Sequence, residues 1–354
     1  MLELVNKSDW EAALQLGWSL ERKRQFTLAV KIGYRFAVDG TLEPLAETPE
    51  LVRADAYHGE PDSSSLSAAS EMVPFKAGAE FLLSGTAHPP KAGVRAMEVE
   101  AALRFNDGSQ WRKTLLIAGE RQWKKNLLGA APTDAKALGP LPLRYEHAFG
   151  GVDDKRDKVD KRNPVGRGFA HRGRVEPGQP LPQIERGPRF IVRPTEQPEP
   201  AGYGPIPSHW QPRLEEQKGF DLKALEDGHC PYPRNVSASL FNCAPKDQRF
   251  PQAFQGGEQL SLRGFFPDHP GAVELELPQP TPEAFLVIDN RWQPLTLQCD
   301  TLQVDTDAGE LYLVWRVGIP WPVSDPREAW VLVQAPHSQA EHETEPHAEQ
   351  EVTA

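Results

Sequence analysis

The clearest pattern in this chain is Phe26-Thr-Leu-Ala-Val-Lys-Ile-Gly-Tyr-Arg-Phe-Ala-Val38, which has an apolar or aromatic side chain at every second position. Successive side chains of a β-strand point to opposite faces, so this spacing gathers the apolar residues on one face. Asp39-Gly40 follows, and this pair is typical of a tight turn. The segment therefore predicts a long strand with one buried face.

The same alternation recurs further along the chain. Met97–Phe105 and Trp111–Ile117 are separated by Asn106-Asp-Gly-Ser109, a combination that predicts a β-hairpin. With this hairpin, the first ~120 residues are expected to form an antiparallel sheet that is buried on one face. Further strands are predicted at 81–87, 260–265, 273–277, 284–288, 302–304, 311–317 and 330–333.

Helices have a small part in the predicted fold. Ser8-x-x-Glu11 fits a capping box that would open a short helix over Trp10–Leu16, which Gly17 would end. The 35 prolines among 354 residues are about twice the usual share of ~5% and favour loops and sheet edges over helical bundles. We therefore predict a mainly β protein with antiparallel, sandwich-like sheets and few short helices.

The middle of the chain differs in composition. Between Leu141 and Arg213, Gly and Pro are too dense for long helices or central strands, yet aromatic residues recur as they would not in a disordered linker. The expected regions are an N-terminal β-rich half (1–130), a loop-rich centre packed on the sheets (131–255), a C-terminal β-rich half (256–336) and a disordered acidic tail (337–354). The sequence leaves open whether the two β-rich halves form one domain or two.

Composition narrows the classes of function. A net charge of −11 opposes general binding to nucleic acids or anionic membranes. No apolar run reaches the ~18 residues of a membrane-spanning helix, and the first residues lack the pattern of a signal peptide. These features predict a soluble, cytoplasmic protein.

Neither a metal nor another cofactor is expected. The cysteines Cys230, Cys243 and Cys299 are too widely spaced for a disulfide framework or a CxxC metal site. A cluster of histidines and acids could be imagined elsewhere, but its members do not have the spacing of a zinc site. These residues are His58, Glu60, Glu71 and His88.

Candidate catalytic groups lie in one central turn. Glu146 and His147 precede Gly150-Gly151, and with Asp153 they offer acids, a base and a flexible turn. A strand end followed by a Gly-Gly turn accounts for the same residues. An enzyme acting at this turn is therefore an alternative, and the residues alone assign no catalytic group.

The basic segment Lys155–Arg174 suggests a second alternative, contact with nucleic-acid phosphates. Its internal Asp157 and Asp160 reduce its field, and Phe169 is its one aromatic residue for base stacking. A solvated loop that contacts an acidic protein surface fits these residues equally well. Nucleic-acid binding is therefore the less favoured alternative.

Several phrases, taken together and in order, resemble a family of uncharacterised-domain proteins encoded beside VgrG spike proteins in bacterial type VI secretion clusters. The resemblance extends from about residue 2 to about residue 335 and leaves out the tail. The phrases are Tyr57-His-Gly-Glu-Pro61, Val73-Pro-Phe-Lys76, Gly85-Thr-Ala-His88, Lys113-Thr-Leu, Gly119-Glu-Arg-Gln-Trp123, Tyr145-Glu-His-Ala-Phe-Gly-Gly151, Asn163-Pro-Val-Gly-Arg-Gly-Phe169, Gly202-Tyr-Gly-Pro-Ile206, His209-Trp-Gln-Pro-Arg213, Asn242-Cys-Ala-Pro245 and Gly256-Gly-Glu258.

The resemblance implies a non-enzymatic adaptor or chaperone, which binds a toxic effector protein and helps load it onto the VgrG spike. No catalytic residue is carried over. Aromatic residues on a Pro-rigid backbone suit protein recognition, although loop-on-sheet packing fits them as well. The candidate partner contacts are Phe169, Tyr203 and Trp210 as anchors, with Arg167 and Arg213 as rim charges. The identity of the effector, and whether the protein travels with the spike, stay open.

Overall fold

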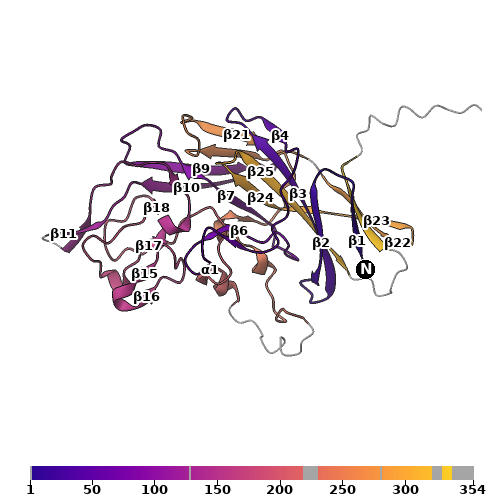
Figure 1. Cartoon of the computed structure of the whole chain (residues 1–354), viewed down its shortest axis with the longest axis horizontal. Coiled ribbons are helices and arrows are strands. Elements are labelled where there is room, and N and C mark those ends of the chain that lie inside the picture. Colours follow the sequence, from indigo (N-terminus) through magenta and orange to yellow (C-terminus); the bar gives the residue numbers. More distant parts are fainter. Residues whose placement is uncertain (1, 127–128, 218–229, 280, 321–328, 337–354) are drawn as a thin grey trace, which may run out of the picture.

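The computed structural model describes residues 2–126, 129–217, 230–279, 281–320 and 329–336. These residues form a mainly β protein of several largely antiparallel sheets, as predicted (Figure 1). The helical elements are short: α1 (Gln211–Leu214), η1 (Tyr145–His147), η2 (Asp154–Arg156), η3 (His171–Gly173), η4 (Glu215–Gln217), η5 (Ala238–Phe241) and η6 (Lys246–Gln248). Among the described residues, none of the helices has the length and apolar character needed to cross a membrane. The tail at 337–354 lies outside the described residues.

Two large sheets form the centre of the molecule. The larger has the order β19-β7-β24-β25-β3-β2, with β4 also paired to β3, and the smaller has the order β18-β10-β9-β20-β21. The strands of the larger sheet are β2 (Glu11–Trp18), β3 (Arg24–Phe36), β4 (Leu42–Pro44), β7 (Ala79–Ser84), β19 (Arg249–Phe250), β24 (Gln298–Asp305) and β25 (Glu310–Pro320). Those of the smaller are β9 (Ala96–Arg104), β10 (Gln110–Ala118), β18 (Ile184–Glu185), β20 (Gln259–Arg263) and β21 (Ala272–Glu276).

A four-stranded sheet lies at one end of the molecule, and short strand pairs order the loops. The four-stranded sheet contains β1 (Glu3–Asn6), β26 (Ala329–Gln334), β22 (Glu283–Ile288) and β23 (Arg291–Leu295). The short pairs are β5 (Ala56–Tyr57) with β6 (Leu66–Ala68), β8 (Thr86–Ala87) with β13 (Leu141–Pro142), β11 (Trp123–Asn126) with β12 (Gly129–Pro132), β14 (Phe149–Gly150) with β17 (Arg167–Gly168), and β15 (Val152–Asp153) with β16 (Lys158–Val159).

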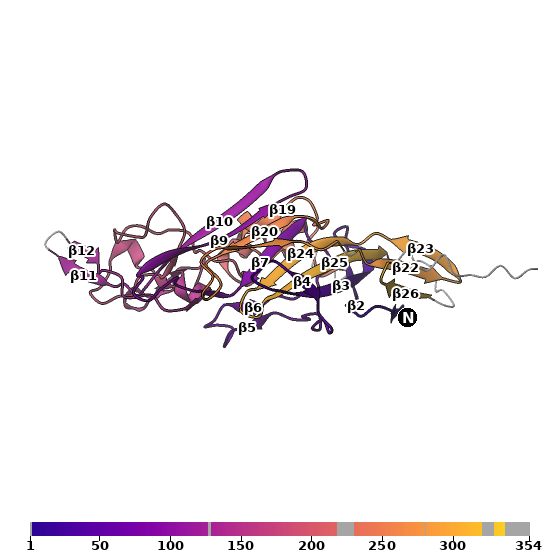
Figure 2. The same cartoon turned by 90° about the horizontal axis from the view of Figure 1, so that it is seen from above.

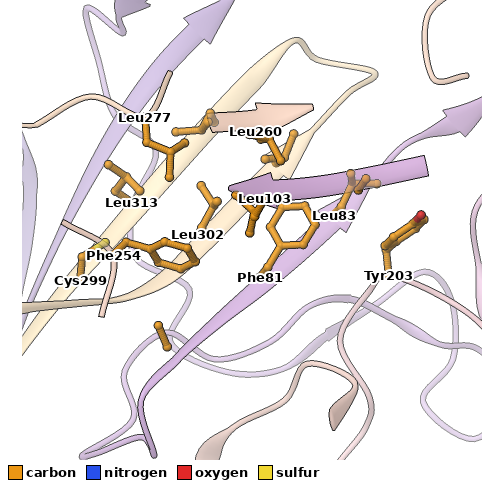
Figure 3. Packing of buried hydrophobic residues seen from close by; sticks show 14 of the residues in the cluster. Phe81, Leu83, Leu103, Tyr203, Phe254, Leu260, Leu277, Cys299, Leu302 and Leu313 are labelled. Atoms are coloured by element: carbon orange, nitrogen blue, oxygen red, sulfur yellow. The ribbon is translucent and has the colours of Figure 1, made fainter. Parts of the chain in front are cut away.

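The two large sheets pack face to face around one apolar core, which confirms the sandwich-like prediction (Figure 2). The alternating residues of β3 supply one side of it, with Leu28 and Val30 fully buried. Leu103 of β9 and Leu260 of β20 supply the other side, and Figure 3 shows them packed near Phe81 of β7. The period-2 pattern in the sequence therefore identifies the core face correctly.

The predicted helix over Trp10–Leu16 is wrong. From Glu11 onward this segment belongs to β2, which pairs antiparallel with β3 from Glu11 opposite Lys31 to Trp18 opposite Arg24. Ser8 closes a turn in place of a helix cap, because its backbone N–H and hydroxyl both donate to the Asn6 side chain. Strand β3 offers a long row of backbone groups, and pairing with it outweighs the weak local preference for a helix.

Strands from the two β-rich halves pair directly with one another. β3 lies beside β25, β7 beside β24, and β9 beside β20. At the end of the molecule, β1 runs parallel to β26. The two halves therefore share the same sheets, while the exact limits of the four predicted regions stay a prediction.

The expectation of one buried face holds only in part, because central strands of the larger sheet are buried on both faces. On the face away from the core, Ala29 and Lys31 of β3 are 0% and 4% exposed. Leu51 and Met72, from the segment between β4 and β7, cover this face by packing against Ala13, Ala29 and Val314 of the sheet. Lys31, which the alternation places on the face away from the core, is therefore a buried cation.

Three ion pairs satisfy the charges on this outer face. Lys31 Nζ lies 3.1 Å from Glu71 Oε1, and Arg316 Nε lies 2.6 Å from Asp300 Oδ2. Lys76 Nζ lies 2.6 Å from Glu80 Oε1. All six side chains are at most 9% exposed. We call these three pairs the outer-face ion pairs.

The outer-face ion pairs fasten loops to the sheet. Arg316 Nη1 donates to the carbonyl oxygens of Glu71 and Val73 at 2.7 and 2.8 Å. Glu80 accepts from the backbone N–H groups of Cys243 and Ala244 at 2.9 and 3.0 Å. Burial alone would lower the pKa of Lys76, but attraction to Glu80 and Asp300 raises it above the usual value, so this lysine is charged.

Replacing one partner of a buried pair leaves the other charge without compensation. We expect Glu80→Gln to lower the free energy of unfolding by about 3–5 kcal/mol, as measured by chemical denaturation. The matched control is Arg112→Ala, which removes an exposed partner of Glu100 and is expected to cost about 1 kcal/mol or less. Equal costs for the two variants would contradict a structural role for the Glu80 pair.

Candidate binding site

The two predicted aromatic anchors, Tyr203 and Trp210, are core residues. Tyr203 is 0% exposed and Trp210 is 1% exposed, so neither can serve as a surface anchor in this structure. The Tyr203 hydroxyl donates to the Lys113 carbonyl at 2.6 Å, and Figure 3 shows its ring within the apolar cluster. The Trp210 ring packs edge-to-face on Tyr145, 5.6 Å away. These residues hold the central loops on the sandwich.

Arg213 has a similar structural role, which corrects its prediction as a rim charge. It is 9% exposed. Its guanidinium donates to the carbonyl oxygens of Ile206 and Leu240, both at 3.1 Å. Phe169 and Arg167 are half-buried, so they alone among the predicted contacts keep access to solvent.

A buried polar junction joins Tyr203 to both large sheets. Lys113 Nζ on β10 donates to Gln248 Oε1 at 2.6 Å and lies 3.2 Å from Asp247 Oδ1. Gln248 in turn donates to the carbonyl oxygens of Phe81 and Tyr203 at 2.7 and 2.9 Å. Burial lowers the pKa of Lys113 to about 8, although attraction to Asp247 opposes this shift.

The candidate catalytic carboxylates are bound to different loops. Glu146 accepts from the backbone N–H and the hydroxyl of Ser65, both at 2.8 Å. Asp153 accepts from Arg156 and from the backbone N–H of His171, each at 3.0 Å. His147 lies beside Arg167. Burial is the main cause that lowers the pKa of His147, and the positive charge of Arg167 lowers it further. Both carboxylates therefore already hold loop segments in place.

The positive charge of the basic segment Lys155–Arg174 is partly neutralised within the fold. Lys155 and Arg156 pair with Glu176. Arg162 pairs with Asp160 and Glu199. These pairs reduce the positive field that phosphates would meet. In the described part of the chain, His, Cys, Asp and Glu side chains do not gather in threes as a metal site would require.

Several pockets open on the surface of the described residues, and two of them border phrases noted in the sequence. One of about 560 Å³ lies beside β9 and the loop after β20, where His88, Glu98, Arg263, Phe266 and His269 line it. The other, of about 470 Å³, lies in the loop-rich region. Its lining combines the phrase Gly119–Trp123 with the phrase Asn163–Phe169, which are more than forty residues apart in the sequence. We call the second one the Arg167 pocket.

The backbone around Arg167 fixes this side chain in position. Arg167 pairs with Phe149 in the short parallel pair β14–β17. A Cβ at the preceding Gly166 would lie 2.7 Å from the Ala148 carbonyl oxygen, so only glycine fits there. The Arg167 guanidinium donates to the Glu146 carbonyl at 2.9 Å and to Gln183 Oε1 at 3.1 Å. The sequence identified Arg167 but contained no signal for Gln183.

A different surface is formed by one face of the four-stranded sheet. Trp292 of β23 is 56% exposed and Val5 of β1 is 38% exposed. Phe285 of β22 packs edge-to-face on Trp292 with 5.7 Å between ring centroids. Leu332, which is itself buried, lies opposite both Val5 and Phe285 in the sheet register, so Val5 and Phe285 share one face. We call this surface the Trp292 face.

The buried amine of Lys113 gives a pH-dependent prediction. Its folded-state pKa of about 8 lies below the unfolded value of ~10.4, so the unfolded protein binds more protons between these values. Stability should therefore rise with pH in this range, by roughly 2 kcal/mol between about pH 7.5 and about pH 9.5. Lys113→Met should remove this rise. The free energy of unfolding of the unaltered protein and of the variant is measured by denaturant titration at each pH. Parallel pH profiles for the two proteins would contradict the lowered pKa.

Comparison with known proteins gives one match. A family profile with the description "Uncharacterized protein conserved in bacteria (DUF2169)" matches residues 21–316. Neither the curated proteins nor the solved structures give a match. The family match covers more than half of the sequence, including most strands of both large sheets and the loop-rich region. The chain therefore belongs to this bacterial family, DUF2169.

Proposed function

We propose that this protein is a non-enzymatic adaptor of a bacterial type VI secretion system, which binds a toxic effector and helps load it onto the VgrG spike. The observation that carries the proposal is the structural role of residues in the phrases that resemble such adaptors. Lys76, Lys113 and Tyr203 fasten loops to the sheets through buried contacts. Because these polar groups hold the loop surface in a fixed shape, the fold suits a binding protein better than a catalyst.

An adaptor that joins two proteins needs two separate surfaces. The molecule is elongated, with the loop-rich region at one end and the four-stranded sheet at the other (Figure 1). The first end has the Arg167 pocket and the second has the Trp292 face. Contacts at opposite ends would allow both partners to bind at the same time.

We assign the effector to the Trp292 face and the spike to the loop-rich end. The family match at 21–316 leaves out β1 and β26 of the four-stranded sheet but includes β22 and β23, which carry Phe285 and Trp292. The loop-rich region lies wholly inside the match and suits a partner common to the family, whereas the four-stranded sheet lies inside it only in part. An exposed Trp beside Phe and Val offers the kind of anchor that dominates protein interfaces.

The first test is recovery of partners from the bacterium that encodes the protein. The tagged full-length protein should co-purify a VgrG-type spike and a toxin-like protein, as identified by mass spectrometry. Recovery of neither partner, in cells that express the secretion system, would refute the adaptor proposal.

A substitution tests which surface holds the effector. Trp292→Ser should weaken effector binding at least tenfold in a titration, because an anchor of this kind is worth about 2 kcal/mol or more. Spike binding should stay unchanged. The matched control is Val38→Ser. Val38 is another apolar residue on the surface, 49% exposed, and it lies away from the Trp292 face. If the folded Trp292→Ser variant binds effector as tightly as Val38→Ser does, the effector contacts another surface.

A further inference from the structure

Arg167 is a half-buried cation whose bonding partners are neutral. Two of its N–H groups donate, one to the Glu146 carbonyl and one to the Gln183 side chain. Among the described residues it forms no ion pair, in contrast to Arg121 of the same pocket, which pairs with Glu185. A guanidinium has five N–H donors and stays protonated in proteins, so Arg167 keeps donors and a charge for a further partner.

The other charges around the pocket largely cancel. Lys136 Nζ lies 2.7 Å from Glu120 Oε2 at the rim, where both side chains are well exposed. Arg121 and Glu185 compensate each other beneath the pocket. Asp134 lies at the rim, where its side chain is exposed to solvent. Burial is the main cause that lowers the pKa of Arg167, and the fields of Glu120 and Glu146 oppose it only in part.

The neighbouring groups suit a small anionic group. Thr133 Oγ1 accepts from the Gln122 backbone N–H at 3.1 Å, which leaves the hydroxyl hydrogen available for a ligand. Pro180 and Leu181 supply apolar wall beside these donors. A volume of about 470 Å³ lies within the usual range for ligand pockets, ~300–1,000 Å³. Arg forms its best-directed contacts with planar carboxylates, through two parallel N–H···O bonds.

We propose that the Arg167 pocket binds a carboxylate group of a partner polypeptide, with Arg167 as its ionic ligand. The carboxylate comes from either the C-terminus of the partner or one of its Asp or Glu side chains, since the two have the same chemistry. That the ligand belongs to a protein rests on the proposed adaptor function. The preference for a carboxylate rests on the pocket alone.

The two sources can be separated with three N-acetylated peptides of one neutral sequence. The first has a free C-terminal carboxylate, the second is its C-terminal amide, and the third is an amide with one internal Glu. Each is titrated calorimetrically into the full-length protein at low salt. Binding of the first or third peptide, at least tenfold tighter than of the neutral amide, is the expected result. Equal binding of all three, or binding of none, would overturn the proposal.

Variants test the role of Arg167 in this binding. Arg167→Gln should weaken binding of the carboxylate peptide at least tenfold, and Arg167→Lys, which keeps the charge but not the planar fork, should weaken it less. The control Arg172→Gln changes an exposed arginine outside the pocket lining and should bind as the unaltered protein does. Thermal unfolding of each variant checks the fold, because Arg167 also holds Gln183. Undiminished binding by folded Arg167→Gln would contradict the assignment.

Failure of the pocket proposal can be distinguished from failure of the proposed adaptor function. If the carboxylate peptides bind but neither spike nor effector is recovered from cells, the pocket stands and the adaptor role fails. If both partners are recovered equally by the unaltered protein and Arg167→Gln, and no peptide binds, the adaptor role stands and the pocket fails.

Discussion

The outer-face ion pairs are the constraint on which the rest of the structure depends. In the sheet register Lys31, Val314, Thr301 and Glu80 lie in one row across four neighbouring strands. Water cannot solvate charges in this row, so the segments that bring Glu71, Lys76 and Ala244 must cover it. Such pairs add little net stability, because desolvation offsets their attraction. Their effect here is to permit one arrangement of loops over the sheet, since other arrangements would leave a buried charge alone.

This constraint decides which residues are left for function. Tyr203, Trp210 and Arg213 have the composition of an interface, but they are needed to close the loops over the sandwich. The groups that face solvent with unused binding capacity are found at the ends of the molecule. One is the Arg167 guanidinium, and the other is the apolar Trp292 face. This arrangement supports the proposal that partners bind at the two ends of the molecule.

The sequence predicts most of the fold because apolar alternation is a local signal. It identifies the core face of β3 and the hairpin of β9 and β10, and both are found in the structure. It fails where the decisive partner is distant. Glu11–Leu16 forms part of strand β2 because β3 offers it an unpaired edge. Lys31 can be buried as a cation because it pairs with Glu71, which is forty residues away in the sequence. No local pattern shows whether Tyr203 faces solvent or core, and that question depends on Lys113, ninety residues away.

The whole-molecule charge limits how the Arg167 pocket can act. With a net charge of −11, the protein repels an acidic partner at long range, so this pocket cannot steer such a partner by its distant field. Salt screens exposed charges within about 8 Å at physiological ionic strength, whereas a half-buried guanidinium is screened less. Arg167 is also held in place before binding by Glu146 and Gln183, which reduces the entropy lost on association. We therefore expect the proposed pocket to select a carboxylate after the partner has made contact, and not to attract it from a distance.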